Sequence, residues 1–395
     1  MSAAPVFIGA PGIVCALGSG ASTVRTRLLA ADMPHALPST DCLTPGQPLA
    51  LGFAAAALPD LSGYAPALRG RNNALLCAAY RQIAAQVDAA IERHGAERVA
   101  VVLGTSTSGI GEAENAFAFW RTSGEFPPDF DYAEQEIGMP SRFLALESGA
   151  RGPAWTISTA CSSSAKALVS AARLLRAGIA DAVIAGGADS LCRFTVAGFS
   201  ALEAVSAARC NPFSRNRAGI NIGEGAALFL MSREPGPVRL SGWGESADAY
   251  HMSAPEPSGA GAMSAINQAL QRAQLVPAQI GYLNLHGTAT EHNDAMESRA
   301  VAQTLGCEGP ASSTKPLTGH TLGAAGAIEA ALCWLTLHGN TQQRLPPHWW
   351  DGQADLALPR LNLIAPGTVA SNLKHALSQS FAFGGSNAAL ILSAE

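Results

Sequence analysis

The stretch "STACSSSAKALVSAARLLRAG", residues 158–178, places one cysteine between small polar residues, directly before a segment with helical periodicity. Small and apolar residues recur at three- and four-residue steps, which predicts a helix with Cys161 near its first turn. A helix N-terminus carries unpaired N–H groups and roughly half a positive charge, so it stabilises a thiolate. We therefore expect a pKa of Cys161 below the ordinary thiol value of about 8.5, which suits a nucleophile. A buried structural cysteine is the alternative.

A second segment repeats this plan. Residues 322–339, "LGAAGAIEAALCWLTLHG", match residues 161–178 in length, in small-residue content and in the glycine at the end. Two halves with one plan are indicated, although alanine-rich helices also resemble one another by chance. Because Ala, Gly and Ser permit close backbone approach, we expect the two helices to be buried centrally and packed against each other.

Short β-branched runs alternate with longer helical patterns along the chain. This alternation predicts an α/β fold in which helices cover a mostly parallel or mixed sheet. Two proline-rich connections, 31–48 and 340–367, lack periodicity and are predicted to be surface loops. The expected strands lie at 98–105, 181–189, 226–232, 280–288 and 387–393.

Composition narrows the class of protein. The 395 residues are 48% hydrophobic and 14% charged, which indicates a globular chain with a large core. A net charge of −5 argues against a nucleic-acid coat or a polybasic membrane anchor. The eight cysteines form no C-x-x-C pair and no zinc-type cluster, so we expect free thiols, no metal and a reducing compartment. Without a signal peptide or an 18-residue apolar run, the sequence predicts a cytoplasmic protein with no membrane span.

Two histidines in the second half are candidate reactive groups. His286 lies in "LNLHGTATEHND", where a strand breaks at glycine, and His320 lies in "STKPLTGHTLGAAG", just before the second central helix. If the halves are related, Cys161 and His320 occupy equivalent helix N-termini and face one cavity with His286. Two neutral imidazoles can donate hydrogen bonds to one thioester oxygen and stabilise an enolate. That is the chemistry of carbon–carbon bond formation on thioesters, although each histidine alone is more often an ordinary one.

Charged residues accompany both histidines. Lys315 and Glu329 flank His320, while Asp294 and Glu297 follow His286. One lysine among three carboxylates predicts a partly buried ion network that holds the histidine loops, with a solvated surface lysine as the alternative.

The segment "SQSFAFGGSNAALIL", 378–392, places a glycine pair before the last strand. A backbone N–H from this loop can complete an oxyanion hole with the N–H of Cys161. Phe381 and Phe383 fit equally well as plain core residues.

Four motifs occur in a fixed order: "TACSSS", "HGTAT", "K-x4-GH-x-LGAAGAIE" and "SFAFGGSN". The set closely resembles the β-ketoacyl-acyl carrier protein synthases of the KAS I/II type, in the thiolase superfamily, from about residue 5 to residue 393. The resemblance implies a thiolase-like fold of two related halves in a layered αβαβα arrangement. The half at 1–235 would carry the nucleophilic cysteine, and the half at 236–395 would carry both histidines.

The resemblance also implies the reaction. Cys161 would accept an acyl chain as a thioester, and His286 and His320 would promote decarboxylation of malonyl-carrier protein. The enolate would attack the acyl-enzyme, giving a 3-oxoacyl product and carbon dioxide, in fatty acid or polyketide elongation. The other implied roles are support by Lys315 and Glu329, oxyanion binding at Phe383, pantetheine binding by Thr288 and Thr290, and substrate contacts from Phe381, the gatekeeper Phe383 and Ile110.

The implied partner is an acidic acyl carrier protein, in a homodimer or a heterodimer with a chain-length-factor-like ketosynthase. No cofactor is implied. Opposite surface potentials steer such encounters, so a basic patch is predicted near the cavity, with solvated surface arginines as the alternative. The candidates are Arg69, Arg71, Arg209, Arg215 and Arg217.

The sequence departs from the family pattern near the acyl chain. Ala382 replaces the usual glycine between two phenylalanines, Gln379 replaces a common asparagine, and the connection 200–227 is shorter. Alanine tolerates positive φ poorly, so gatekeeper motion is open to question. These changes predict altered substrate choice, as in a secondary-metabolite or aryl-polyene-type pathway.

Two other functions compete with this hypothesis. A biosynthetic thiolase usually involves a second cysteine near the C-terminus, and no cysteine follows Cys333. A non-catalytic partner subunit typically lacks the active cysteine or a histidine, whereas this chain keeps all three residues.

Overall fold

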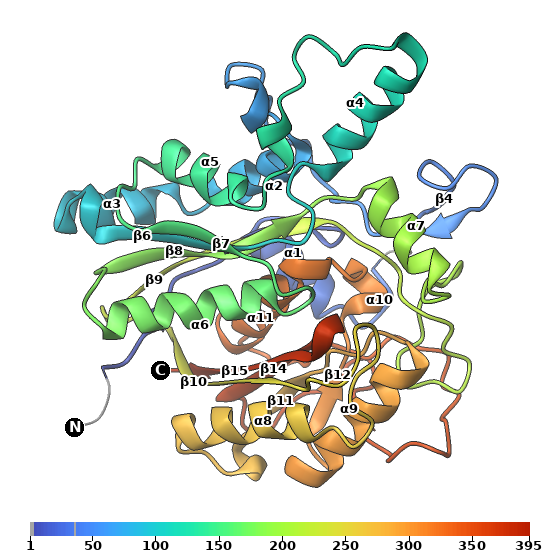
Figure 1. Cartoon of the computed structure of the whole chain (residues 1–395). Coiled ribbons are helices and arrows are strands. Elements are labelled where there is room, and N and C mark those ends of the chain that lie inside the picture. Colours follow the sequence, from blue (N-terminus) through green and yellow to red (C-terminus); the bar gives the residue numbers. More distant parts are fainter. Residues whose placement is uncertain (1–3, 35–36) are drawn as a thin grey trace.

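The computed structural model describes residues 4–34 and 37–395 and shows five layers (Figure 1). The main sheet is continuous by strand pairing but forms two layers, called here the first and the second sheet, with α6 (Ser163–Arg176) and α11 (Ala325–Leu337) between them. Helices α2 (Arg71–Tyr80), α3 (Ala84–His94) and α5 (Met139–Ser148) cover the outer face of one sheet, and α8 (Ala260–Ala273) and α9 (Glu291–Thr304) cover that of the other. The predicted αβαβα arrangement is confirmed.

The two sheets share one strand pattern. In the first, the order is β7-β6-β8-β9, with parallel pairing among the first three strands and antiparallel pairing of β8 with β9. In the second, β12-β11-β14-β15 repeats that order and those directions. The strands of the first sheet are β6 (Val99–Gly104), β7 (Ala154–Ile157), β8 (Ala182–Asp189) and β9 (Gly225–Ser232). Those of the second are β10 (Val238–Ala247), β11 (Tyr282–Asn284), β12 (Pro310–Ser312), β13 (Asn362–Leu363), β14 (His375–Phe381) and β15 (Ser386–Ala394).

Helix positions repeat as well, since α6 links β7 to β8 as α11 links β12 to β14. The chain therefore folds as two related halves. The short strand β1 (Phe7–Ile8) joins them by pairing with β9 on one side and β10 on the other. Near it, β2 (Gly12–Cys15) extends the first sheet and pairs with β3 (Gly18–Ser19), while β4 (Ser39–Thr40) and β5 (Leu49–Ala50) form a separate ribbon.

The central helices pack together as their small residues predict. Helix α11 is buried on nearly every side, which requires an apolar residue at almost every position. At the crossing, a Cβ added to Gly326 would lie 2.7 Å from both Cβ and N of Ala165. The N–H of Ala327 donates to Ser164 Oγ at 2.8 Å, so a backbone-to-side-chain bond crosses the same contact. Only residues with small side chains allow α6 and α11 to approach this closely.

The remaining helices lie around the margins. Helix α1 (Ala21–Leu28) packs against α11, and α4 (Ile110–Ser123) extends away from the layers (Figure 1). Helices α7 (Arg193–Ala201) and α10 (Lys315–Thr318) lie at the end of the molecule where the candidate site is built. None of the helices in the described ranges combines the length and apolarity that a membrane span requires.

The structure corrects part of the predicted secondary structure. The five predicted strands are present, although the one expected at 280–288 is confined to Tyr282–Asn284. Strands β10 and β14 were not predicted, because serine, glutamine and glycine interrupt their apolar pattern. The connection 340–367 is largely irregular as expected, but it is not only a surface loop, since residues 345–348 are buried.

The helix crossing generates a stability prediction. Gly326→Ala places a methyl group against the backbone of α6, so we expect a loss of about 1–3 kcal/mol in the free energy of unfolding. Chemical denaturation measures it. Gly198→Ala is the matched control, because Gly198 is also helical and has open space around it. A Gly326→Ala protein as stable as the control would contradict the close contact.

Candidate active site

Cys161 lies on a sharp turn between β7 and α6. The preceding residue, Ala160, has a φ of 52°, a conformation that an L-residue adopts only when its surroundings enforce it. Side chains at the start of α6 hold the turn: Ser163 Oγ accepts from the N–H of Thr159 at 2.8 Å, and Ser162 Oγ donates to Ser386 Oγ at 2.9 Å. The second bond ties the cysteine turn to the first residue of β15.

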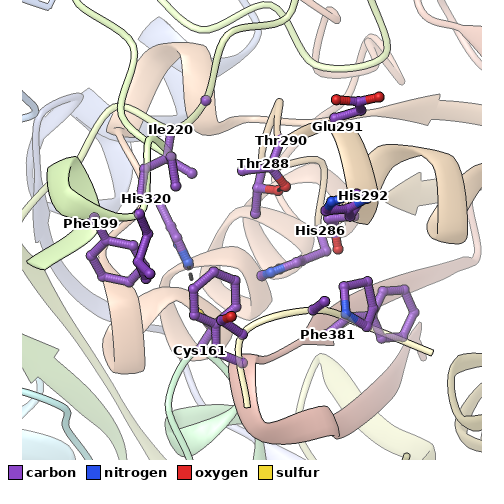
Figure 2. Close-up of a pocket in the computed structure, with 18 of the residues that line it drawn as sticks. Cys161, Phe199, Ile220, His286, Thr288, Thr290, Glu291, His292, His320 and Phe381 are labelled. Atoms are coloured by element: carbon purple, nitrogen blue, oxygen red, sulfur yellow. Dashed lines mark hydrogen bonds between the residues drawn. The ribbon is translucent and has the colours of Figure 1, made fainter. Parts of the chain in front are cut away.

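The two histidines and the cysteine meet in one buried chamber (Figure 2). Nε2 of His320 lies 3.0 Å from Sγ of Cys161. The ring centroids of His286 and His320 are 5.3 Å apart, with their planes nearly perpendicular. One side-chain atom from each of the three residues lies within 4.8 Å of the other two. The similarity between segments 161–178 and 322–339 predicted that Cys161, His286 and His320 face one cavity, and this convergence is confirmed.

Different segments position the two rings. His286 follows β11, where the chain leaves the sheet. His320 lies between α10 and α11, and its backbone bonds to the other half: its N–H donates to Asn221 O at 2.6 Å, and its carbonyl accepts from Gly223 at 2.9 Å. Gly319 makes this contact possible, because it has a φ of 69° and an added Cβ would lie 2.9 Å from Gly223 Cα.

The expected acidity of Cys161 is wrong. Burial raises the pKa of the thiol to about 11, although Lys315 and the backbone N–H groups of Phe383 and Cys161 oppose the shift. The N-terminus of α6 does not outweigh the loss of water around the sulfur. Burial also lowers the pKa of His286 and that of His320 well below 6.5, and Lys315 adds to both shifts. At neutral pH the chamber therefore holds one thiol and two neutral imidazoles.

Lys315 fixes one of those imidazoles. Its Nζ donates to the carbonyl O of His286, pairs with Glu329 Oε1 at 2.5 Å and lies 3.5 Å from His286 Nδ1. An ammonium group has only donors, so it favours the tautomer of His286 whose Nδ1 is bare and whose Nε2 carries the proton. The ring then presents an N–H to the chamber. The alternative of a solvated surface lysine is wrong, since Lys315 is buried.

Asp294 and Glu297 hold the loop in a different way from the one predicted. Glu297 accepts from the N–H groups of His286 and Gly287 at 2.6 and 2.7 Å. Asp294 accepts from the N–H of Phe213 at 2.7 Å and from that of Ala289 at 3.2 Å. The single ion network is therefore divided: Lys315 pairs with Glu329, while the other two carboxylates bind backbone.

A cavity of about 570 Å³ opens on Cys161, and most of the predicted substrate residues line it. Thr288 and Thr290 lie on one wall, with 2.9 Å between their hydroxyl oxygens, and Phe381 and Phe383 lie on another. Ile110 begins α4 and does not line this cavity within the single chain. Sequence reasoning missed Phe199 of α7, which also lines the cavity and whose ring packs against that of Phe383 with 5.6 Å between the centroids.

The loop after β14 has the backbone that an oxyanion hole requires. The backbone N–H groups of Phe383 and Cys161 lower the pKa of the thiol, against the effect of burial. Gly384 and Gly385 have φ values of 81° and 75°. Ala382 has a φ of −95°, which any residue adopts, so the missing glycine costs nothing in this conformation.

Two supporting residues carried no sequence signal. Asp189 is completely buried and accepts from Thr105, Ser106 and Thr107 in one half and from the N–H of Ala324 in the other. His348 lies in the proline-rich connection and accepts from the N–H of Ser313. Both fix segments that carry the reactive groups, and only the tertiary fold brings their partners together.

Two of the five arginines proposed for a basic patch already form ion pairs with carboxylates of this chain. Nε of Arg71 donates to the buried Glu224 at 2.8 Å, and Arg217 pairs with Asp355 at 2.6 Å. Arg217 still lines the cavity. Arg69, Arg209 and Arg215 form no ion pair within the described ranges.

The trio of reactive atoms permits two kinds of chemistry. One thiol and two imidazoles could hold a zinc ion with an open position, since zinc favours these ligands. They also suit a nucleophile beside two hydrogen-bond donors. Comparison with known proteins distinguishes these possibilities.

The family model described as "Beta-ketoacyl synthase, N-terminal domain" matches residues 70–235, and "Beta-ketoacyl synthase, C-terminal domain" matches residues 238–348. The chain belongs to the β-ketoacyl synthase family. A curated relative, 3-oxoacyl-(acyl-carrier-protein) synthase 2 of Vibrio harveyi, is 33% identical in an alignment of 326 positions that covers 76% of this chain and 76% of the relative.

Solved ketosynthases share the whole fold. A ketosynthase (ApeO) in complex with its chain length factor (ApeC) from Xenorhabdus doucetiae is 47% identical, covers 99% of this chain and 98% of its own, and gives a TM-score of 0.91. A β-ketoacyl synthase from Burkholderia phymatum is 27% identical, with 99% coverage of both chains and a TM-score of 0.85. The family resemblance seen in the motifs is confirmed, which favours the nucleophile over the metal site.

The position of His320 generates a prediction about Cys161. At pH 7.5 a thiol with a pKa of about 11 reacts slowly unless a neighbour takes its proton, and His320 Nε2 is 3.0 Å away. We expect His320→Ala to slow alkylation of Cys161 by iodoacetamide about tenfold or more, measured by mass spectrometry. His292→Ala is the control, because His292 lines the same cavity without a hydrogen bond to the sulfur. Equal rates in the two variants would contradict this role.

Proposed function

We propose that this chain catalyses the decarboxylative Claisen condensation of an acyl group on Cys161 with malonyl-acyl carrier protein. The products are 3-oxoacyl-acyl carrier protein and carbon dioxide. The observation that carries the proposal is the buried trio, with His320 Nε2 at 3.0 Å from the sulfur and both rings facing one cavity. The family and its curated relatives, named as 3-oxoacyl-acyl carrier protein synthases, support the same reaction.

The first step loads the enzyme. His320 takes the proton of Cys161, and the thiolate attacks the thioester carbonyl of the acyl-carrier protein. The N–H groups of Cys161 and Phe383 stabilise the oxyanion that forms. The carrier's thiolate leaves and takes the proton that His320 had accepted, so His320 is neutral again and the acyl group passes to the sulfur with no net change in charge.

The second step forms the enolate. Loss of carbon dioxide from the malonyl group places negative charge on its thioester oxygen, and the Nε2–H of His286 is directed at the chamber where that oxygen would lie. Nδ1 of His320 is buried with no hydrogen-bond partner among the described residues, so neither tautomer of this ring is fixed. His320 therefore accepts a proton in the first step and donates from Nε2 in the second.

The third step joins the carbons. The enolate attacks the acyl-enzyme carbonyl, and the bond to the sulfur breaks. The thiolate of Cys161 then takes up one proton from solvent, because loss of carbon dioxide from the malonyl carboxylate consumes one proton overall. Lys315 holds the His286 ring through this sequence, with its charge balanced by Glu329. Asp294 and Glu297 position the loop, and Thr288, Thr290 and Phe381 contact the substrate arm along the cavity wall. Ile110 would contribute to the acyl pocket only beside a partner subunit.

Assembly and setting belong to the same proposal. The two halves are 1–235 and 236–395, and the family-model matches meet between 235 and 238. The solved relative with 47% identity pairs with a chain length factor, which supports a heterodimer of that kind for this chain. We infer a secondary-metabolite pathway in the cytoplasm, with Arg69, Arg209 and Arg215 as the remaining docking candidates for the carrier. The mass of the purified protein, with and without a co-expressed partner, distinguishes a heterodimer from a homodimer.

Replacing the nucleophile tests the reaction. We expect Cys161→Ala to form no acyl-enzyme from acyl-carrier protein and to leave the unfolding temperature nearly unchanged, since the change removes one atom at the wall of an existing cavity. Intact-mass spectrometry detects the acyl adduct. Cys77→Ala, at a buried cysteine outside the cavity, should load normally.

Normal acyl transfer by Cys161→Ala would overturn the proposal. Carbon dioxide release provides the second readout. The wild-type enzyme should release one equivalent from the malonyl thioester for each product, whereas a thiolase would release none.

A further inference from the structure

A second large cavity lies at the far end of α6 from Cys161. Its volume is about 610 Å³, and its walls include Arg176, Arg239, Arg272 and Gln274. Cys161 precedes the first turn of α6 and Arg176 is its last residue. A helix of 14 residues spans roughly 20 Å at 1.5 Å per residue, so this cavity is separate from the active site.

Two of the arginines share one aromatic ring. The guanidinium carbon of Arg176 lies 4.3 Å from the ring centroid of Trp243, and that of Arg272 lies 5.6 Å from it. Arg272 also donates to the carbonyl O of Trp243. Burial and the neighbouring charge of Arg272 lower the pKa of Arg176. The ring therefore holds two like charges close together at an open cavity.

Carboxylates do not balance this charge. Arg239 lies 2.9 Å from Glu395 Oε1, while Glu245 is paired with Arg173, which is exposed on the same helix. Within residues 4–34 and 37–395, Arg176 and Arg272 form no ion pair, and Nε of Arg176 is buried without a hydrogen-bond partner. Helices α6 and α8 both end here, and their C-termini favour cations, which accounts for arginine at these positions. It does not account for Arg176, whose buried Nε has no partner.

We propose that this cavity binds a phosphate group of a small molecule through Arg176 and Arg272, with Arg239 at its edge. A guanidinium presents parallel N–H groups that match a phosphate, and a phosphate between two guanidiniums removes their repulsion. The volume lies within the usual range for small-molecule sites and is larger than a lone phosphate requires. The site is independent of the condensation reaction.

Titration calorimetry with pyrophosphate at constant ionic strength tests this site. We expect saturable binding of one pyrophosphate per chain in the wild type. Binding should weaken about tenfold or more in Arg176→Gln and in Arg272→Gln, because each removes charge-assisted hydrogen bonds. Arg173→Gln is the matched control, since Arg173 lies on the same helix, pairs with Glu245 and does not line the cavity. This control should bind like the wild type.

Two further measurements complete the test: the affinity for ADP and the unfolding temperature of the wild type. If ADP binds more tightly than pyrophosphate, the occupant is nucleotide-sized, whereas equal affinity indicates a free anion. If the variants do not fold, the wild type decides, because its unfolding temperature should rise with pyrophosphate and saturate at constant ionic strength. Absence of saturable binding to the wild type, or unchanged affinity in both folded variants, would overturn the proposal.

Discussion

The close approach of α6 and α11 is the constraint on which the rest of the structure depends. Cys161 and His320 precede these helices in the two halves, and the distance between the reactive atoms is set by how near the helix starts can come. Gly326 against Ala165 makes that distance small, and the bond from Ala327 to Ser164 fixes it. Without this contact between the halves, Cys161 would lie apart from the two histidines, which both belong to the second half.

Burial then determines the charge of the chamber. Because the three side chains are buried, the thiol holds its proton and both imidazoles are neutral, while the buried ion pair of Lys315 and Glu329 lies beside them. A neutral imidazole can donate a hydrogen bond to a developing enolate without the cost of burying another cation. The same burial makes His320 necessary for Cys161, because the helix terminus alone does not ionise the thiol.

Much of this arrangement could be predicted from sequence where a local pattern carries it. The similar small-residue segments 161–178 and 322–339 indicated the pair of central helices, and apolar runs such as 98–105 indicated buried strands. Polar β14 escaped prediction because its burial comes from neighbours and not from its own apolarity. Asp189 and His348 were missed for the same reason, since each holds segments that are distant in sequence. The predicted low pKa of Cys161 was wrong, because the desolvation that raises the pKa depends on surrounding atoms that the local motif does not contain.

The central claim is that burial keeps the two imidazoles of the chamber neutral. Nitrogen-15 NMR of the labelled histidine rings, recorded on the Cys161→Ala protein between pH 8 and pH 5.5, measures this directly. The account predicts that His286 and His320 stay neutral across this range, with the proton of His286 on Nε2. Conversion of either ring to imidazolium near the ordinary value of about 6.5 would contradict it.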